Sequence, residues 1–296
     1  MGKRGWALVF ALCCLMAVCR AENSGLEEQW PMILDALASD ESLPVPAEYR
    51  ISVRPGEMLR GGKAEEGYLN LIVCSTDVEN LKENYGRADA ILVCRVNLET
   101  GESRLLSMPY SGMAALDELP EPIYLRYVNC FGGPRLTARV LNDALGTRVD
   151  RYLSLNIDAF MAIVDALGGV DMTLTEDEAE ALEMKAGKQA LTGEQALSYI
   201  RLRRGGDTAA RMRALMEAML RQLFSLSSTN QAFALVDAVM SASDTNLTTD
   251  DVIDLVFAVL GQEQKSAFET KALLLENGVF DDAARQQAQD FLYGRE

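Results

Sequence analysis

The segment 152–174 constrains the fold more than any other part of the chain. It reads as a strand at 152–156, a helix whose apolar residues share one face, and a second strand at 170–174. Asp158 is in position to cap the helix, and the Gly168–Gly169 pair ends it. A strand–helix–strand unit of this length favours two parallel strands joined by a right-handed crossover.

Other short strand patterns extend this alternation. Residues 69–75 and 90–98 are continuous apolar runs, which is typical of strands buried on both faces. Residues 49–53 alternate like a half-buried strand, and 104–109 predict another strand. In 131–146, FGGPRLTARVLNDALG, the Gly-Gly-Pro run predicts a helix start and the last glycine its end. Strands interleaved with helices predict an α/β fold with a layered sheet.

Composition shifts divide the chain into four intervals. In residues 1–21, two basic residues precede an apolar run, which predicts an export signal cleaved after Ala21 or an uncleaved membrane anchor. Residues 22–47 are acidic, contain three prolines and predict a linker with one short helix. Residues 48–225 form the α/β domain, and 226–296 are a mostly helical extension that completes the same domain.

Charge and residue types exclude several functions. The formal net charge is -16, from 28 basic and 44 acidic residues, which argues against a nucleic-acid partner. The chain has no histidine, which excludes histidine triads, histidine metal sites and histidine general bases. Cys74, Cys94 and Cys130 lie outside the leader without CxxC spacing and predict buried thiols, with a Cys74–Cys94 bridge as the alternative.

Five arginines crowd around Asp207 within this acidic chain: Arg201, Arg203, Arg204, Arg211 and Arg213. Guanidinium groups clamp phosphate or carboxylate bidentately, so the cluster indicates one specific anion. The alternative is a solvated helix face with salt bridges.

The chain after Asp207 predicts a helix with an apolar stripe along one side, and the two arginines of the cluster that lie in this helix point in different directions. At ~100° per residue, Arg213 falls within the apolar stripe and Arg211 about 160° away on the opposite flank. We therefore expect Arg213 to be the semi-buried one. A bound anion or Glu217, four residues on, would be its partner.

Several motifs resemble the LytR–CpsA–Psr (LCP) family. The matching pieces cover about residues 70–213: NLIVCSTD, GRADAILV, LLSMP, FGGP, YLSLNIDAFMAIVDALGGVDM and LTGEQALSYIRLR. The DALGGVD and LTGEQALSYIR runs are long and specific. The resemblance implies a three-layered α/β/α fold with a central mixed β-sheet.

Members of this family are exported proteins that transfer glycopolymers, such as teichoic acid or capsule, from a polyprenyl (pyro)phosphate carrier to peptidoglycan. The resemblance therefore implies a glycopolymer phosphotransferase with pyrophosphate hydrolysis, acting with Mg²⁺ at the outer face of the cytoplasmic membrane. Phosphoryl transfer depends on positioning and charge neutralisation, so it needs no histidine.

Two carboxylates and several arginines are the candidate site. Asp77 follows one apolar strand and Asp89 opens the next, so paired strands would bring both to one sheet edge. The resemblance implies that Asp77 and Asp89 bind the metal and that Asp89 assists deprotonation of the acceptor. It also implies phosphate binding by four arginines: Arg87, Arg201, Arg203 and Arg213. Of these, Arg87, Arg201 and Arg213 share the catalytic role with Asp89. Ordinary turn and cap chemistry is the alternative for the two aspartates.

Two arginines that the family pattern places near the phosphates are missing here. Tyr110 and Ser111 stand where the family has Arg and Asp, and Ala210 and Ala214 replace a second Arg and a Gln. Three hypotheses stay open: an active transferase, a catalytically impaired relative that binds lipid phosphate or glycan or regulates envelope assembly, and an interaction domain whose arginines are paired internally.

Overall fold

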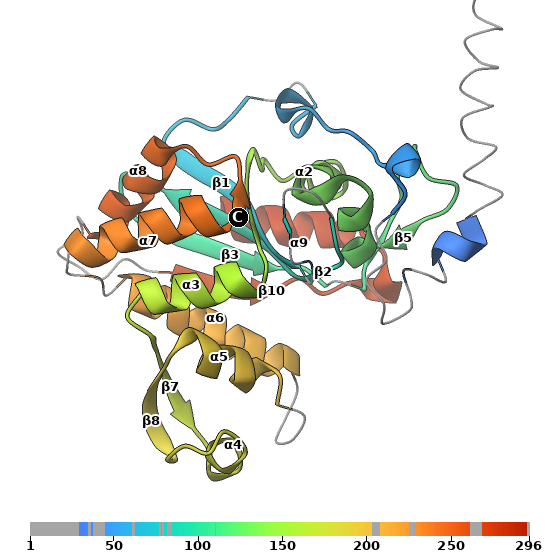
Figure 1. Cartoon of the computed structure of the whole chain (residues 1–296). Helices are drawn as coiled ribbons and strands as arrows, with labels where there is room; N and C mark the ends of the chain where they lie inside the picture. Colours follow the sequence, from blue (N-terminus) through green and yellow to red (C-terminus); the bar gives the residue numbers. More distant parts are fainter. Residues whose placement is uncertain are drawn as a thin grey trace, which may run out of the picture.

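The structure is a computed structural model, shown in Figure 1. It describes residues 30–34, 37, 45–60, 63–76, 78, 80–81, 85–109, 111–202, 208–224, 226, 229–260 and 268–294, and for a few of these in helices and strands the backbone alone. Within these ranges, no helix combines the length and apolar character needed to span a bilayer.

A six-stranded mixed sheet forms the centre of the molecule, with the strand order β10-β3-β2-β1-β6-β9. The strands are β1 (Tyr68–Thr76), β2 (Ala88–Asn97), β3 (Ser103–Ser107), β6 (Arg151–Leu155), β9 (Asp244–Thr245) and β10 (Phe268–Ala272). β1 pairs antiparallel with β2 and parallel with β6, and β3 pairs parallel with β10. The strands predicted at 69–75, 90–98, 104–109 and 152–156 are therefore confirmed in type.

Helices cover both faces of this sheet. They are α2 (Leu125–Leu145), α3 (Ile157–Ala166), α4 (Glu176–Ala181), α5 (Gly193–Ile200), α6 (Thr208–Phe224), α7 (Thr229–Ala242), α8 (Thr249–Leu260) and α9 (Asp282–Tyr293). Short 3₁₀ turns lie at Ala47–Tyr49, Pro55–Glu57 and Glu276–Gly278. Two small hairpins, β4 (Met113–Ala114) with β5 (Ile123–Tyr124) and β7 (Val170–Leu174) with β8 (Gly187–Leu191), complete the fold.

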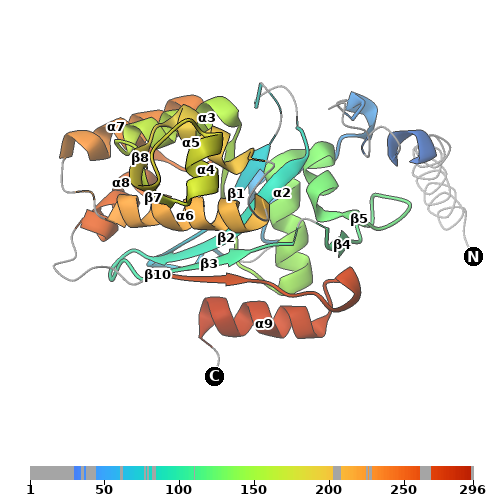
Figure 2. The same cartoon turned by 90° about the horizontal axis from the view of Figure 1, so that it is seen from below.

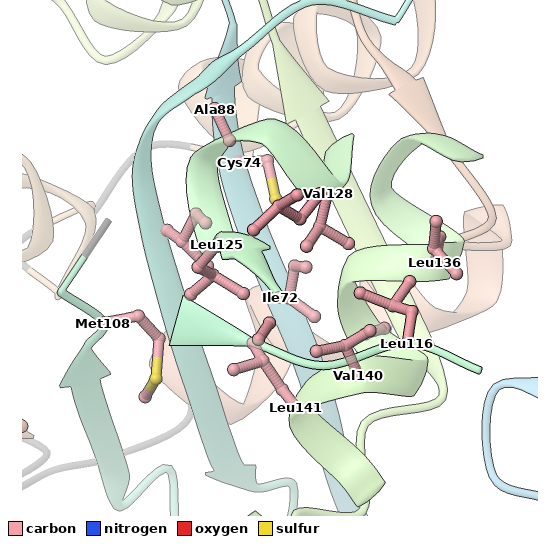
Figure 3. Close-up of a cluster of buried hydrophobic side chains, with 14 of the residues drawn as sticks. Ile72, Cys74, Ala88, Met108, Leu116, Leu125, Val128, Leu136, Val140 and Leu141 are labelled. Atoms are coloured by element: carbon pink, nitrogen blue, oxygen red, sulfur yellow. The ribbon is translucent and has the colours of Figure 1, made fainter. Parts of the chain in front are cut away.

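Alternate residues of the central strands face two separate cores. Ile72 and Cys74 of β1 pack with α2 and α9, and Figure 3 shows this core closed by Leu125, Val128 and other α2 residues. Leu69 and Leu71 of the same strand pack on the other side, with α3, α7 and α8. Continuous apolar runs in β1 and β2 are the sequence signature of burial on both faces. The predicted three-layered α/β/α fold is confirmed.

The predicted parallel pairing of 152–156 with 170–174 is wrong. β6 does pair in parallel, but its partner is β1, and β7 instead forms an antiparallel hairpin with β8. This hairpin and α4 project from the body of the molecule in Figure 1. The burial of β7 alternates, with Asp171 and Thr173 exposed, so this strand has one wet face. A strand in the middle of the sheet would be apolar on both sides.

One expectation near the N-terminus needs correction. Residues 49–53 form no strand, because their alternating apolar side chains follow a 3₁₀ turn over the α2 core. The short helix expected within 22–47 is present: residues 30–34 are helical, and Trp30, Ile33 and Leu37 are buried in the α2 core. Residues 1–21 lie outside the described residues.

The C-terminal interval 226–296 contributes to the same sheet. β9 pairs with β6 at one edge and β10 with β3 at the other. The run FETKALLL contains β10, and the last helix is α9, whose N-cap is Asp281. Figure 2 shows α9 lying along the edge formed by β3 and β10.

Cys74 and Cys94 are buried and not joined to each other, so the alternative Cys74–Cys94 bridge is wrong, and Cys130 is buried as well. Cys74 lies opposite Ile91 and Cys94 opposite Leu71, so the two cysteines are not neighbours in the β1–β2 ladder. Cys74 also faces the core formed with α2, and Cys94 the core formed with α3. Burial raises the pKa of Cys94 to about 12 and also raises the pKa of Cys74. Buried thiols of this kind are unreactive.

Candidate functional site

Asp89 lies on a β-bulge at the start of β2. Thr76 pairs with Ala88 and Ser75 with Ala90, so β2 carries one residue more than β1 at this point, and that residue is Asp89. A bulge changes the direction in which a strand presents its side chains. Asp89 is thereby directed to the α2 side of the sheet, and its side chain is 47% exposed.

The carboxylate of Asp89 binds a guanidinium that the sequence motifs do not identify. Nη2 of Arg126, in the first turn of α2, donates to Oδ1 of Asp89 over 2.8 Å. Because 37 residues separate the two in sequence, no local pattern predicts this ion pair. Only the packing of α2 against the end of the β1–β2 hairpin brings them together.

Arg87 lies two residues before Asp89 and is partly buried. Ala88, between them, begins β2 and is buried. Asp77 follows directly on Thr76, the last residue of β1, and lies outside the described residues.

The first part of α2 is fixed to both segments that approach Arg126. The backbone N–H of Leu125 donates to the carbonyl of Gly112 over 2.8 Å. Nδ2 of Asn129, which is buried, donates to the carbonyl of Gly86 over 2.8 Å. Arg126 therefore stands on a helical turn held by the segment after β3 on one side and by the segment before β2 on the other.

The FGGP motif introduces a kink into α2, the helix that carries Arg126. Gly132 and Gly133 have non-helical backbone angles, and Gly133 has φ +65°, so the helix is kinked there and continues from Pro134. A Cβ at 133 would lie 2.5 Å from a ring carbon of Tyr85. The predicted helix from Pro134 to the C-cap Gly146 is confirmed, and the preceding turns from Leu125 add to it.

The two longest motifs interlock beside the candidate anion site. Asp165 of DALGG accepts a hydrogen bond from the backbone N–H of Gly193 in LTGEQ over 2.8 Å. A Cβ on Gly193 would lie 2.5 Å from the carbonyl oxygen of Met161, so only glycine permits this approach of α3 and α5. Thr192 and Gln195 form a capping box at the start of α5. In the first of these motifs the cap of α3 is Asn156, not the predicted Asp158.

These contacts fix the end of α5, where the arginine segment begins. Arg201 is the C-cap of α5 and its side chain is exposed. Arg203 and Arg204 lie outside the described residues, as does Asp207. Arg213 lies in α6, and its side chain is outside the described part.

Arg211 is the buried arginine of α6, so the prediction that placed it away from the packed face is wrong. Its side chain is only 4% exposed, and it shares its face with Leu215 and Ala218, which pack against β7. Nη2 of Arg211 donates to the backbone carbonyl of Leu202. The apolar stripe of α6 misled the prediction because the helix buries the side that faces β7, where Arg211 is held by a carbonyl. Glu217 is the predicted partner of Arg213, and its Oε2 lies 3.9 Å from Nη1 of Arg221.

The charged side chains that the structure brings together are therefore Asp89 and Arg126, and Arg87 lies two residues before Asp89 in sequence. Arg201 lies at the end of a helix on the opposite side of the sheet from α2. In the described ranges, no group of three or more Asp, Glu, Cys or His residues could hold a metal ion.

Comparisons with known proteins place these features in a family. The model of the LytR_cpsA_psr family matches residues 46–290. A relative from Halalkalibacterium halodurans, named polyisoprenyl-teichoic acid–peptidoglycan teichoic acid transferase TagU, is 30% identical over 177 residues, which are 57% of this chain and 58% of the relative. The match thus spans somewhat more than half the length of that relative.

Solved structures share the fold. TagV of B. subtilis has a TM-score of 0.62 at 19% identity, covering 77% of this chain and 98% of that structure. TagT bound to LI-WTA has a TM-score of 0.63 at 18% identity, covering 83% and 98%. Because the family model matches residues 46–290, which is well over half of the chain, the chain belongs to the LytR_cpsA_psr family.

Proposed function

We propose that this chain is a phosphotransferase that moves a glycopolymer of the teichoic acid type from a polyprenyl-(pyro)phosphate carrier to peptidoglycan. Support comes from family membership and from the names of relatives, which are teichoic acid transferases acting on a polyisoprenyl-linked substrate. The export signal or anchor expected in residues 1–21 would place the reaction at the outer face of the cytoplasmic membrane.

The position of Asp89 is the structural observation that carries the proposal. A bulge turns this carboxylate out of the ladder, and arginines lie before it in sequence and against it in space. A carboxylate paired with a guanidinium at the end of a central strand suits phosphoryl transfer, in which charge neutralisation and positioning dominate.

The reaction is a displacement at phosphorus. An acceptor hydroxyl of peptidoglycan forms a new P–O bond to the phosphorus that carries the glycopolymer. The P–O bond to the carrier phosphate breaks, and polyprenyl phosphate leaves. Asp89 would receive the proton of the hydroxyl, and Arg87, Arg201, Arg203 and Arg213 would hold the phosphate oxygens. With water as the acceptor, the same displacement is pyrophosphate hydrolysis.

Mg²⁺ fits the donor chemistry proposed for this site. Magnesium is usually held by one or two carboxylates together with substrate phosphates. Asp89, an exposed carboxylate, and Asp77, which follows β1, would hold it. When bound, the ion would neutralise charge on the phosphate oxygens.

Turnover of a polyprenyl-pyrophosphate substrate with Mg²⁺ tests the proposal. Replacing Arg201 and Arg213 together by Ala should lower kcat/KM at least about a hundredfold, since each charge-assisted contact contributes roughly 1.5–3 kcal/mol. Arg221→Ala is the matched control, because Arg221 is an exposed arginine of the same helix that pairs with Glu217. Wild-type turnover no higher than that of the double variant would refute the proposal.

A catalytically impaired relative is the second candidate, motivated by Tyr110, Ala210 and Ala214. It predicts that the wild type binds a polyprenyl pyrophosphate without turnover. Arginine introduced at positions 110 and 210 should then produce turnover. Substantial wild-type turnover that these two substitutions leave unchanged would argue against this candidate.

A further inference from the structure

Asp89 creates an electrostatic difficulty for an anion site. A carboxylate close to a pyrophosphate group repels it, and the repulsion near a protein surface is several-fold stronger than in bulk water. Without a neighbouring cation, Asp89 would weaken the binding of the anion that the arginines attract. The described structure supplies such a cation from within the chain.

Arg126 is that cation. Its Nη2 lies 2.8 Å from Oδ1 of Asp89, which is a charge-assisted hydrogen bond. The two side chains are 26% and 47% exposed, so the pair lies at the surface and is accessible from solvent. Because of the bulge, Asp89 is turned toward α2 and meets this guanidinium.

The helical turn that bears Arg126 is held rigidly. Leu125 before it is bonded to Gly112, and Asn129, three residues later on the same side of the helix, is bonded to Gly86. Gly86 in turn lies directly before Arg87. The guanidinium is therefore fixed relative to the segment that carries Arg87 and Asp89, which is a pre-arranged geometry.

We propose that Arg126 is a positioning residue that neutralises Asp89, so that a pyrophosphate headgroup can bind before a divalent cation does. This inference rests on the proposed function. In the metal-free protein, Arg126 holds the carboxylate and cancels its charge. Asp89 would be neutralised without Arg126 if the carboxylate held Mg²⁺, so the contribution of Arg126 to anion binding would then be smaller.

Calorimetric binding of farnesyl pyrophosphate, a short polyprenyl pyrophosphate, in EDTA and in excess Mg²⁺ tests this role. Arg126→Gln should weaken binding about tenfold or more in EDTA, as expected for the loss of a charged partner, and by clearly less in Mg²⁺. Asp89→Asn should strengthen binding in EDTA. The double variant Asp89→Asn, Arg126→Gln should bind better than Arg126→Gln alone, because no uncompensated carboxylate remains. Arg126→Lys should keep most of the metal-free affinity.

Arg60→Gln is the matched control. Arg60 pairs with Asp143 over 2.9 Å near the other end of α2, and both side chains are partly exposed. This variant should leave both affinities unchanged, and thermal unfolding of every variant checks that the fold is kept.

Two results would overturn the role of Arg126 alone: equal affinities of the wild type and Arg126→Gln in EDTA, or a double variant as weak as Arg126→Gln. A wild type that binds farnesyl pyrophosphate under neither condition would contradict the proposed function itself, and this inference with it.

Discussion

The buried guanidinium of Arg211 holds the main chain beside the arginine segment. It donates to the carbonyl of Leu202, directly after the exposed Arg201. Arg211→Met keeps the volume but leaves this carbonyl without its donor, at a cost of about 1–3 kcal/mol. We expect trypsin to cut the segment Arg201–Arg204 about tenfold faster in this variant, which corresponds to ~1.4 kcal/mol of easier opening. Mass spectrometry of the fragments gives the rate. Arg221→Met serves as the control, and equal cleavage rates in the two variants would contradict the role of Arg211.

Asp251 gives a second residue-scale prediction, in the pH dependence of stability. Burial acts to raise the pKa of Asp251, but hydrogen bonds from Arg151 and Thr248 outweigh it and hold the pKa below its usual value. A lowered folded-state pKa stabilises the fold above the unfolded pKa, and this stability is lost as the pH falls through the folded value.

Asp251→Asn should therefore lower the free energy of unfolding by about 1–3 kcal/mol at pH 7. The difference from the wild type should shrink as the pH falls below about 4, where the unfolded aspartate takes up its proton. Urea unfolding at pH 7 and at pH 3 measures both values. A difference that stays constant between the two pH values would contradict the assignment.

At the scale of elements, the kink in α2 governs how the helix meets the site. Gly133 has φ +65° and ψ -163°, a conformation that essentially only glycine adopts, whereas Gly146 has φ +65° and ψ +26°, the left-handed helical region that alanine reaches at a smaller cost. A Cβ at 133 also strikes the ring of Tyr85 at 2.5 Å, whereas a Cβ at 146 approaches the flexible end of Gln289 at 3.0 Å. Gly133→Ala should thus destabilise the protein more than Gly146→Ala, by about 1–3 kcal/mol for overpacking.

Chemical denaturation compares the two variants. Tyr85→Ala added to Gly133→Ala should recover part of the difference, because it removes the ring that the new Cβ meets. If Gly133→Ala and Gly146→Ala were equally destabilised, the contact with Tyr85 would not explain the glycine.

At the scale of the whole molecule, the two ends of the described chain share one core. The ring centroids of Trp30 and Phe131 lie 5.8 Å apart, and Leu292 of α9 belongs to the same core. Tyr293 also accepts a hydrogen bond from the backbone of Arg148, and Arg104 donates to the carbonyl of Phe291. Loss of packing at α9 should therefore destabilise the part of the core that contains Trp30.

Leu292→Ala should destabilise the protein by about 2–5 kcal/mol, as for other buried leucines. In a Trp6→Phe background, the fluorescence of Trp30 and the far-UV circular dichroism should shift to lower urea concentration together. Gln286→Ala, on the exposed side of α9, is the control. A Trp30 transition that did not move would mean that the N-terminal helix and α9 unfold independently.

Apolar patterning determined most of the secondary structure from sequence. Short apolar runs in the sequence correspond to five of the strands, β1, β2, β3, β6 and β10. Glycines mark two of the helix ends, at Gly146 and Gly168. The sequence did not predict correctly which strands pair. The parallel partner of β6 is β1, far earlier in the chain, because helices cover both faces of these two strands, whereas β7 has one exposed face.

For the candidate site as well, the sequence predicts some features and the tertiary structure alone provides the others. Asp77, Arg87, Asp89 and the arginine segment were identified by motifs, because each lies next to a strand or helix end that the sequence marks. Arg126 and the burial of Arg211 depend on packing between distant segments, and the bulge at Asp89 on the register of two strands. The sequence by itself determined which residue types are available for chemistry and which elements carry them. Only the tertiary structure decided which charges meet, because the partner of a charged side chain is set by its distance in space, while a sequence pattern records only its neighbours along the chain.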